Sequence, residues 1–219
     1  MLSAPVPSQI VNVRWLGSQN YLKTWDAMKA FTQMRDSDTI DEIWLLEHEP
    51  VYTQGQNGKP EHILNPGDIP IVKTDRGGQV TYHGPGQLMI YILMDLKRKK
   101  FSIRDLVSNL ELTIIDFLQT LSITAFAKRE APGIYLAEHR KIASIGLRIK
   151  RGCAYHGLAF NIDLDLAPFS QINPCGFANL QMTTLALHTQ KAEDTQNIAS
   201  VLYPFLLKHL DYQYGIRCD

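Results

Sequence analysis

A series of short strand-like segments, separated by turns rich in glycine, proline and asparagine, constrains the fold of this chain most. Only a few helical segments interrupt the series. This order predicts an α+β fold rather than a strict alternation of strands and helices. The expected strands cover residues 11–15, 43–46, 71–74, 79–82, 87–93, 133–136, 141–149 and 153–162.

Three longer helices are expected near the start, middle and end of the chain. The first begins at about Tyr21. The clearest begins near Ser102, where Ser102 and Asp105 have the spacing of a capping box and apolar residues recur with a period close to 3.6 up to residue 121. The last covers about residues 192–210, and Pro204 should kink or restart it.

Length and charge exclude several classes of protein. The 219 residues can bury a substantial core, and no linker divides them, so a single domain over residues 1–219 is expected. Because 22 basic residues balance 22 acidic ones, neither nucleic acid nor a membrane surface is an expected partner. Three cysteines form no disulfide framework, and Met1 to Pro7 resemble neither a signal nor a transit peptide, so a cytoplasmic protein is expected.

A glycine-rich segment is the first candidate for chemistry. Its paired glycines let the backbone approach a ligand closely, and its arginine, threonine, tyrosine and histidine offer polar groups. It matches no nucleotide-binding fingerprint, and it could instead be a hairpin with ordinary side chains. The segment reads Arg76-Gly77-Gly78-Gln79-Val80-Thr81-Tyr82-His83-Gly84-Pro85-Gly86-Gln87.

Lys141 is the second candidate, because it begins a strand whose alternation places it on the same face as Ala143, Ile145 and Leu147. An apolar face is a costly place for an ammonium group. Lys141 therefore either reaches water from the strand end or is a functional group.

Cys175 is the third candidate, because Pro174 and Gly176 place it in a tight turn where a thiol is accessible. It could be a nucleophile, or it could be a small buried apolar residue, as free cysteines often are. Of the other two cysteines, Cys153 is expected in the core, and Cys218, next to the carboxyl terminus, is expected to be disordered or incidental.

No metal site is expected, because the sequence has no clustered Cys and His motif and alternation places Cys153 and His156 on opposite faces of a strand. The basic run Lys97-Arg98-Lys99-Lys100 is either a solvated loop or a contact for an acidic protein.

Together and in this order, these motifs resemble the octanoyltransferases of protein lipoylation. The resemblance covers about residues 40–185 and includes four motifs: the glycine-rich segment, Lys141 to Gly146, Gly157 to Asn161, and Asn173 to Gly176. It implies the fold of the biotin/lipoate protein ligase catalytic domain, with a large mixed β-sheet and packed helices.

The resemblance also implies a reaction and its residues. An octanoyl or lipoyl group would pass from the thioester of acyl carrier protein to a lysine of a lipoyl domain, either in the E2 subunits of 2-oxoacid dehydrogenases or in the glycine cleavage H protein. Cys175 matches the nucleophile, and Lys141 matches the lysine that favours its thiolate. The protein would need no cofactor and act as a monomer. The residues that line the acyl-substrate site would be Arg76, Gly77, Gly78, Gln79, Val80, Thr81, Tyr82, His83, Ser144, Ile145, Gly146, Gly157, Leu158 and Ala159.

Three other functions stay open from the sequence. An ATP-dependent lipoate or biotin ligase of the same fold would keep its activity in a Cys175→Ala variant. A cysteine hydrolase with His83 as its base would release free octanoate. A non-catalytic acyl-binding module would bind the acyl chain without reacting.

Overall fold

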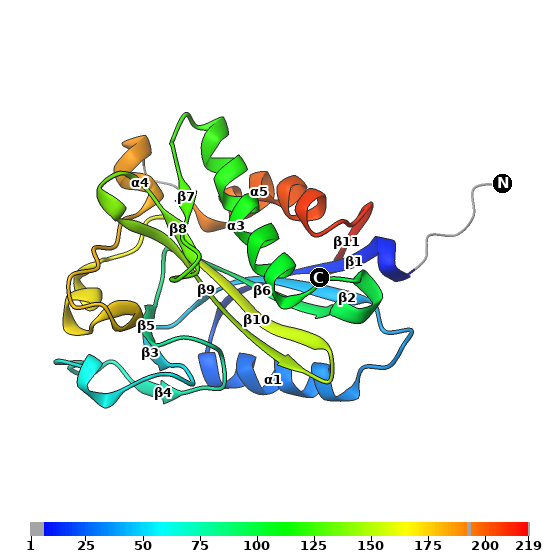
Figure 1. The fold of residues 1–219 in the computed structure, drawn as a ribbon, viewed down its shortest axis with the longest axis horizontal. Helices are drawn as coiled ribbons and strands as arrows, with labels where there is room; N and C mark the ends of the chain where they lie inside the picture. The colour runs from blue at the N-terminus through cyan, green and yellow to red at the C-terminus, as the bar shows by residue number, and fades with distance from the viewer. Residues whose placement is uncertain (1–6, 192–193, 219) are drawn as a thin grey trace.

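Two β-sheets and three longer helices make up the protein in a computed structural model that describes residues 7–191 and 194–218 (Figure 1). The larger sheet has eight strands in the order β11-β1-β2-β6-β10-β9-β8-β7. Because β1 pairs in parallel with β2 and β11 while the other neighbours are antiparallel, the sheet is mixed, as expected. The smaller sheet has the order β4-β3-β5.

The strands are β1 (Ile10–Gln19), β2 (Asp41–His48), β3 (Val51–Gln54), β4 (Ile71–Lys73), β5 (Val80–His83), β6 (Gln87–Asp95), β7 (Phe126–Ala127), β8 (Gly133–Tyr135), β9 (Lys141–Lys150), β10 (Cys153–Asn161) and β11 (Tyr214–Cys218). The α-helices are α1 (Tyr21–Met34), α2 (Leu96–Lys99), α3 (Ile103–Thr120), α4 (Leu185–Thr189) and α5 (Thr195–His209). Short 3₁₀ turns cover Pro7–Gln9, Pro60–His62, Ala137–His139, Ala167–Gln171 and Pro174–Gly176.

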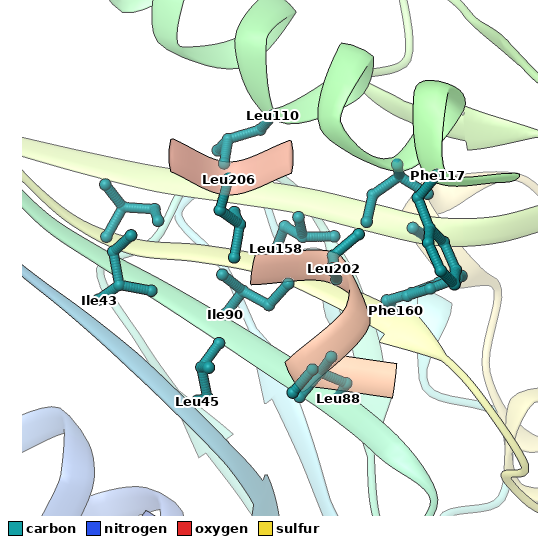
Figure 2. Packing of buried hydrophobic residues seen from close by; sticks show 14 of the residues in the cluster. Ile43, Leu45, Leu88, Ile90, Leu110, Phe117, Leu158, Phe160, Leu202 and Leu206 are labelled. Carbon is teal, nitrogen blue, oxygen red and sulfur yellow. The ribbon is translucent and has the colours of Figure 1, made fainter. Parts of the chain in front are cut away.

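The main core lies between the large sheet and helices α3 and α5, while α1 covers the opposite face (Figure 1). Figure 2 shows Leu110 and Phe117 of α3 and Leu202 and Leu206 of α5 above apolar side chains of β2, β6 and β10. Burial of this apolar face is the main force that holds both helices on the sheet. The capping box of α3 is present, with Asp105 N donating to Ser102 Oγ at 3.1 Å and Ser102 N to Asp105 Oδ2 at 2.8 Å.

Several sequence expectations are wrong in detail. Strand β3 was not expected, and Cys218 is not disordered, because it pairs with β1 as the last residue of β11. Helix α5 is continuous through Pro204, which excludes a restart there but leaves the expected kink a prediction. Its start at Thr195 is later than expected, and residues 192–193 of the expected range lie outside the described residues.

The basic run is not a solvated loop, because Lys97 to Lys99 lie in α2 and two of its four side chains bond within the protein. The buried Lys99 ammonium donates to the carbonyl oxygens of Ser8 and Asp211, and the Arg98 guanidinium lies 2.6 Å from Asp41 Oδ1. Only Lys97 and Lys100 of this run remain exposed, which leaves two cations for an acidic partner.

Candidate active site

Cys175 lies in the 3₁₀ turn Pro174–Gly176, as its neighbours predicted. Its φ of +56° is a left-handed conformation that a non-glycine residue rarely adopts, and such strain is often kept at functional sites. A hydrogen bond of 2.8 Å from Asn173 N to the His62 carbonyl anchors the turn. The thiol is half-buried and therefore reachable.

Lys141 is buried at the start of β9, with only 1% of its surface exposed, so the alternative in which its head reaches water is excluded. Its backbone donates to the Gln181 carbonyl at 2.9 Å and accepts from Thr183 N at 3.0 Å. These bonds hold the segment that follows the cysteine turn against the strand. The ammonium donates to the Pro132 carbonyl at 3.1 Å and to Cys175 Sγ at 3.2 Å.

The environment of Lys141 favours its ammonium form. Burial lowers the pKa of Lys141, but the Cys175 sulfur and the Tyr135 hydroxyl more than offset it, so the pKa lies above its ordinary value. A cation within hydrogen-bond distance stabilises the nucleophilic form of a cysteine. The pair can therefore form an acyl thioester and move a proton.

The pair lies at a cavity of about 480 Å³ whose walls come from both sheets. The structure brings together most of the residues that the sequence placed there. Besides Lys141 and Cys175, the predicted residues that line it are Arg76, Gly77, Gly78, Gln79, Val80, Thr81, His83, Ser144, Ile145, Gly146, Gly157, Leu158 and Ala159.

Tyr82 is the exception among the predicted residues, because its side chain lies away from the cavity. Alternation along β5 places it with Tyr52 and Phe169 in a separate apolar cluster of the small sheet. We therefore exclude Tyr82 from the candidate site.

Arg76 has a different environment from the one expected of a substrate contact. Its guanidinium donates to the Thr53, Gly77 and Gln79 carbonyls at 2.6, 2.9 and 2.8 Å, and burial lowers its pKa. These bonds fix the curved backbone of the glycine-rich loop beside the cavity. Arg76 therefore supports this wall of the cavity by holding the backbone of the glycine-rich loop in place.

A polar cluster centred on Asp75 was not predicted from the sequence. Its carboxylate accepts hydrogen bonds from Trp25 Nε1 at 2.8 Å, His156 Nε2 at 2.9 Å and the Tyr155 hydroxyl. Burial opposes the charge, but these bonds outweigh it and lower the pKa of Asp75. The cluster ties the glycine-rich loop to α1 and β10.

His156 joins this cluster because it adopts a φ of +61° within β10. Alternation would place its imidazole with Ala154 and Leu158 on the face that α3 and α5 cover. The left-handed backbone instead turns the imidazole towards Asp75 and stacks it on Tyr155. Strand alternation therefore breaks at His156, and the prediction from alternation that Cys153 and His156 lie on opposite faces does not hold. In residues 7–191 and 194–218, no group of three or more His, Cys, Asp or Glu side chains could hold a metal ion.

Gly157 has a strict steric requirement. A Cβ atom there would lie 1.9 Å from the Ile90 carbonyl oxygen of the neighbouring strand. We expect Gly157→Ala to lower the free energy of unfolding by about 3 kcal/mol, because β6 and β10 would have to separate.

Gly67→Ala is the matched control, because its φ of +57° strains alanine but no atom lies within 4 Å of the added Cβ. That variant should lose only about 1 kcal/mol. Urea unfolding followed by circular dichroism measures both, and equal losses would contradict the steric explanation.

Comparison with known proteins identifies the family. The sequence model of the lipoyl protein ligase A/B catalytic domain matches residues 20–205. The chain belongs to this family. It is 60% identical over 175 residues to an octanoyltransferase of Shewanella frigidimarina, covering 80% of this chain and 81% of that protein. An octanoyltransferase of Shewanella oneidensis is 58% identical over 172 residues, covering 78% of this chain and 79% of that protein.

Solved structures confirm the predicted fold of the lipoyl protein ligase family. A lipoate-protein ligase A bound with ATP superposes with a TM-score of 0.76 at 15% identity, covering 95% of this chain and 87% of that one. The bipartite lipoate protein ligase of Thermoplasma acidophilum superposes with a TM-score of 0.76 at 11% identity, covering 96% of this chain and 88% of that one. No helix in the described part of the chain is long and apolar enough to cross a membrane.

Proposed function

We propose that the protein is an octanoyltransferase that moves an octanoyl group from a carrier-protein thioester to a lysine of a lipoyl domain. The observation that carries the proposal is the 3.2 Å contact between Lys141 Nζ and Cys175 Sγ beside the cavity. The similarity to octanoyltransferases that are about 60% identical to the chain supports octanoyl as the transferred group. Burying about six methylenes in the cavity could contribute roughly 5 kcal/mol of binding.

In the first step, the Cys175 thiolate attacks the thioester carbonyl. A new carbon–sulfur bond forms, the bond to the carrier sulfur breaks, and the carrier thiolate takes a proton from the Lys141 ammonium. One thioester replaces another, so the step is nearly isoenergetic and needs no ATP. Covalent catalysis divides the transfer between two proteins into two encounters.

In the second step, the acceptor lysine attacks the acyl thioester. Acylation removes the negative sulfur, so burial dominates the environment of Lys141 and favours its neutral amine. This amine accepts the proton that the attacking lysine releases. The amide forms, Cys175 leaves as a thiolate, and the starting ion pair returns.

The proposal includes the expected setting of the reaction. We propose one catalytic domain over residues 1–219, acting as a cytoplasmic monomer, with octanoyl-acyl carrier protein as donor. Its acceptors would be the lipoyl domains of E2 subunits and the glycine cleavage H protein. Sedimentation of the purified protein at about twice 24.8 kDa would contradict the monomer.

A transfer assay without ATP tests the proposal against its three alternatives. Octanoyl-acyl carrier protein, the purified protein and a lipoyl domain should give a lipoyl domain heavier by about 126 Da, one octanoyl group less one hydrogen. A requirement for ATP would indicate a ligase. Free octanoate alone would indicate a hydrolase, and no product would indicate a binding module.

A further inference from the structure

Glu111 is a carboxylate on the buried face of α3, where its neighbours Leu110 and Ile114 belong to the apolar core. Only 9% of the residue is exposed. Burying a carboxylate is costly unless it is bonded. Neither proposed step uses this group, so its position needs another explanation.

The bond that Glu111 makes leads towards the candidate site. Glu111 Oε1 accepts a hydrogen bond from Gly133 N at 3.1 Å. Gly133 N belongs to the same peptide group as the Pro132 carbonyl. That carbonyl accepts from Lys141 Nζ at 3.1 Å, and Lys141 Nζ lies 3.2 Å from Cys175 Sγ. One planar peptide thus joins the carboxylate to the lysine.

The packing around this peptide leaves little freedom. A Cβ atom on Gly133 would lie 2.5 Å from Lys141 Cε and 2.6 Å from the Ala143 carbonyl oxygen. The backbone at Gly133 therefore packs directly on the lysine side chain. Burial raises the pKa of Glu111, and the Gly133 N–H and the Lys141 ammonium oppose that rise.

We propose that Glu111 is a positioning residue that orients the Pro132–Gly133 peptide and thereby holds the Lys141 ammonium beside Cys175. The inference rests on the proposed roles of Lys141 and Cys175 and adds a third residue from a different helix. Its effect runs through the hydrogen bond to Gly133, so a neutral side chain that keeps an acceptor oxygen should preserve it.

The test measures how fast iodoacetamide alkylates Cys175 at neutral pH, with peptide mass mapping to separate it from the other cysteines. This rate depends on the thiolate and needs neither donor nor acceptor protein. Glu111→Met keeps the apolar length but removes the acceptor, and Glu111→Gln keeps an acceptor oxygen. Asp116→Asn, on the same helix but paired with Lys208, is the matched control.

We expect Glu111→Met to slow alkylation about tenfold, a size that one lost buried hydrogen bond can produce. The alkylation rate of Glu111→Gln should stay within about threefold of the parent rate, and the rate of Asp116→Asn should equal the parent rate. In a Lys141→Ala background, Glu111→Met should add no further loss, because both changes remove the same interaction.

Three results would overturn the inference: an unchanged rate in Glu111→Met, the same loss in both backgrounds, or a Glu111→Gln rate as low as that of Glu111→Met. Glu111→Leu gives the same comparison should Glu111→Met not fold by circular dichroism. A parent-like alkylation rate in the Lys141→Ala single variant would contradict the proposed lysine–cysteine pair. This outcome distinguishes a failure of the pair from a failure of the inference about Glu111.

Discussion

Replacing Cys175 with serine is expected to reduce octanoyl transfer by at least about 10⁴-fold, because the reaction loses its covalent nucleophile. A serine hydroxyl keeps almost the same volume and can still accept a hydrogen bond from Lys141, so the fold should be unaffected. The measurement is the initial rate of lipoyl-domain octanoylation, with unfolding temperature as the check on structure.

Cys218→Ser is the matched control for this loss. Cys218 lies at the end of β11 and is not among the residues that line the 480 Å³ cavity. This variant should transfer octanoyl at the parent rate. Retained transfer in Cys175→Ser would favour direct attack by the acceptor lysine and would exclude the acyl-enzyme.

Replacing Lys141 with arginine is expected to slow the second step by about 100-fold or more while part of the first step remains. Arginine keeps a cation near the sulfur, but a guanidinium does not release its proton under these conditions, so it cannot accept one from the attacking lysine. Loss of a general acid–base group has effects of this size.

Single-turnover measurements separate the two steps in Lys141→Arg. Acylation is followed by the mass of the enzyme, and deacylation by the mass of the lipoyl domain after the donor is removed. Lys150→Arg, at the exposed end of the same strand, should match the parent in both. Full second-step activity in Lys141→Arg would refute the proton relay.

Local sequence signals predicted much of the candidate site. Pro174 and Gly176 indicated the turn around Cys175, and the glycine-rich segment indicated a backbone wall. The capping box of α3 also followed from residues three apart, Ser102 and Asp105. These features depend on conformational preferences that act over a few residues.

Features that depend on distant contacts could not be predicted in the same way. The buried position of Lys141 requires Gln181 and Thr183, which lie about 40 residues further along the chain. His156 breaks the alternation of its strand because Asp75, 81 positions away, bonds to it. Local periodicity carries no information on such pairings.

Glu111 shows the same limit on a helix. Its spacing places it on the apolar face of α3, and the sequence gives no sign that a backbone N–H from β8 will meet it there. A charged residue within an apolar helical face is the signal that could have singled it out.

The intact mass of the protein after incubation with octanoyl-acyl carrier protein, in the absence of ATP, tests directly whether Cys175 carries the acyl group. We expect an adduct of about 126 Da on Cys175 that disappears when a lipoyl domain is added. An unmodified enzyme during active transfer, or an adduct that the lipoyl domain does not remove, would contradict it.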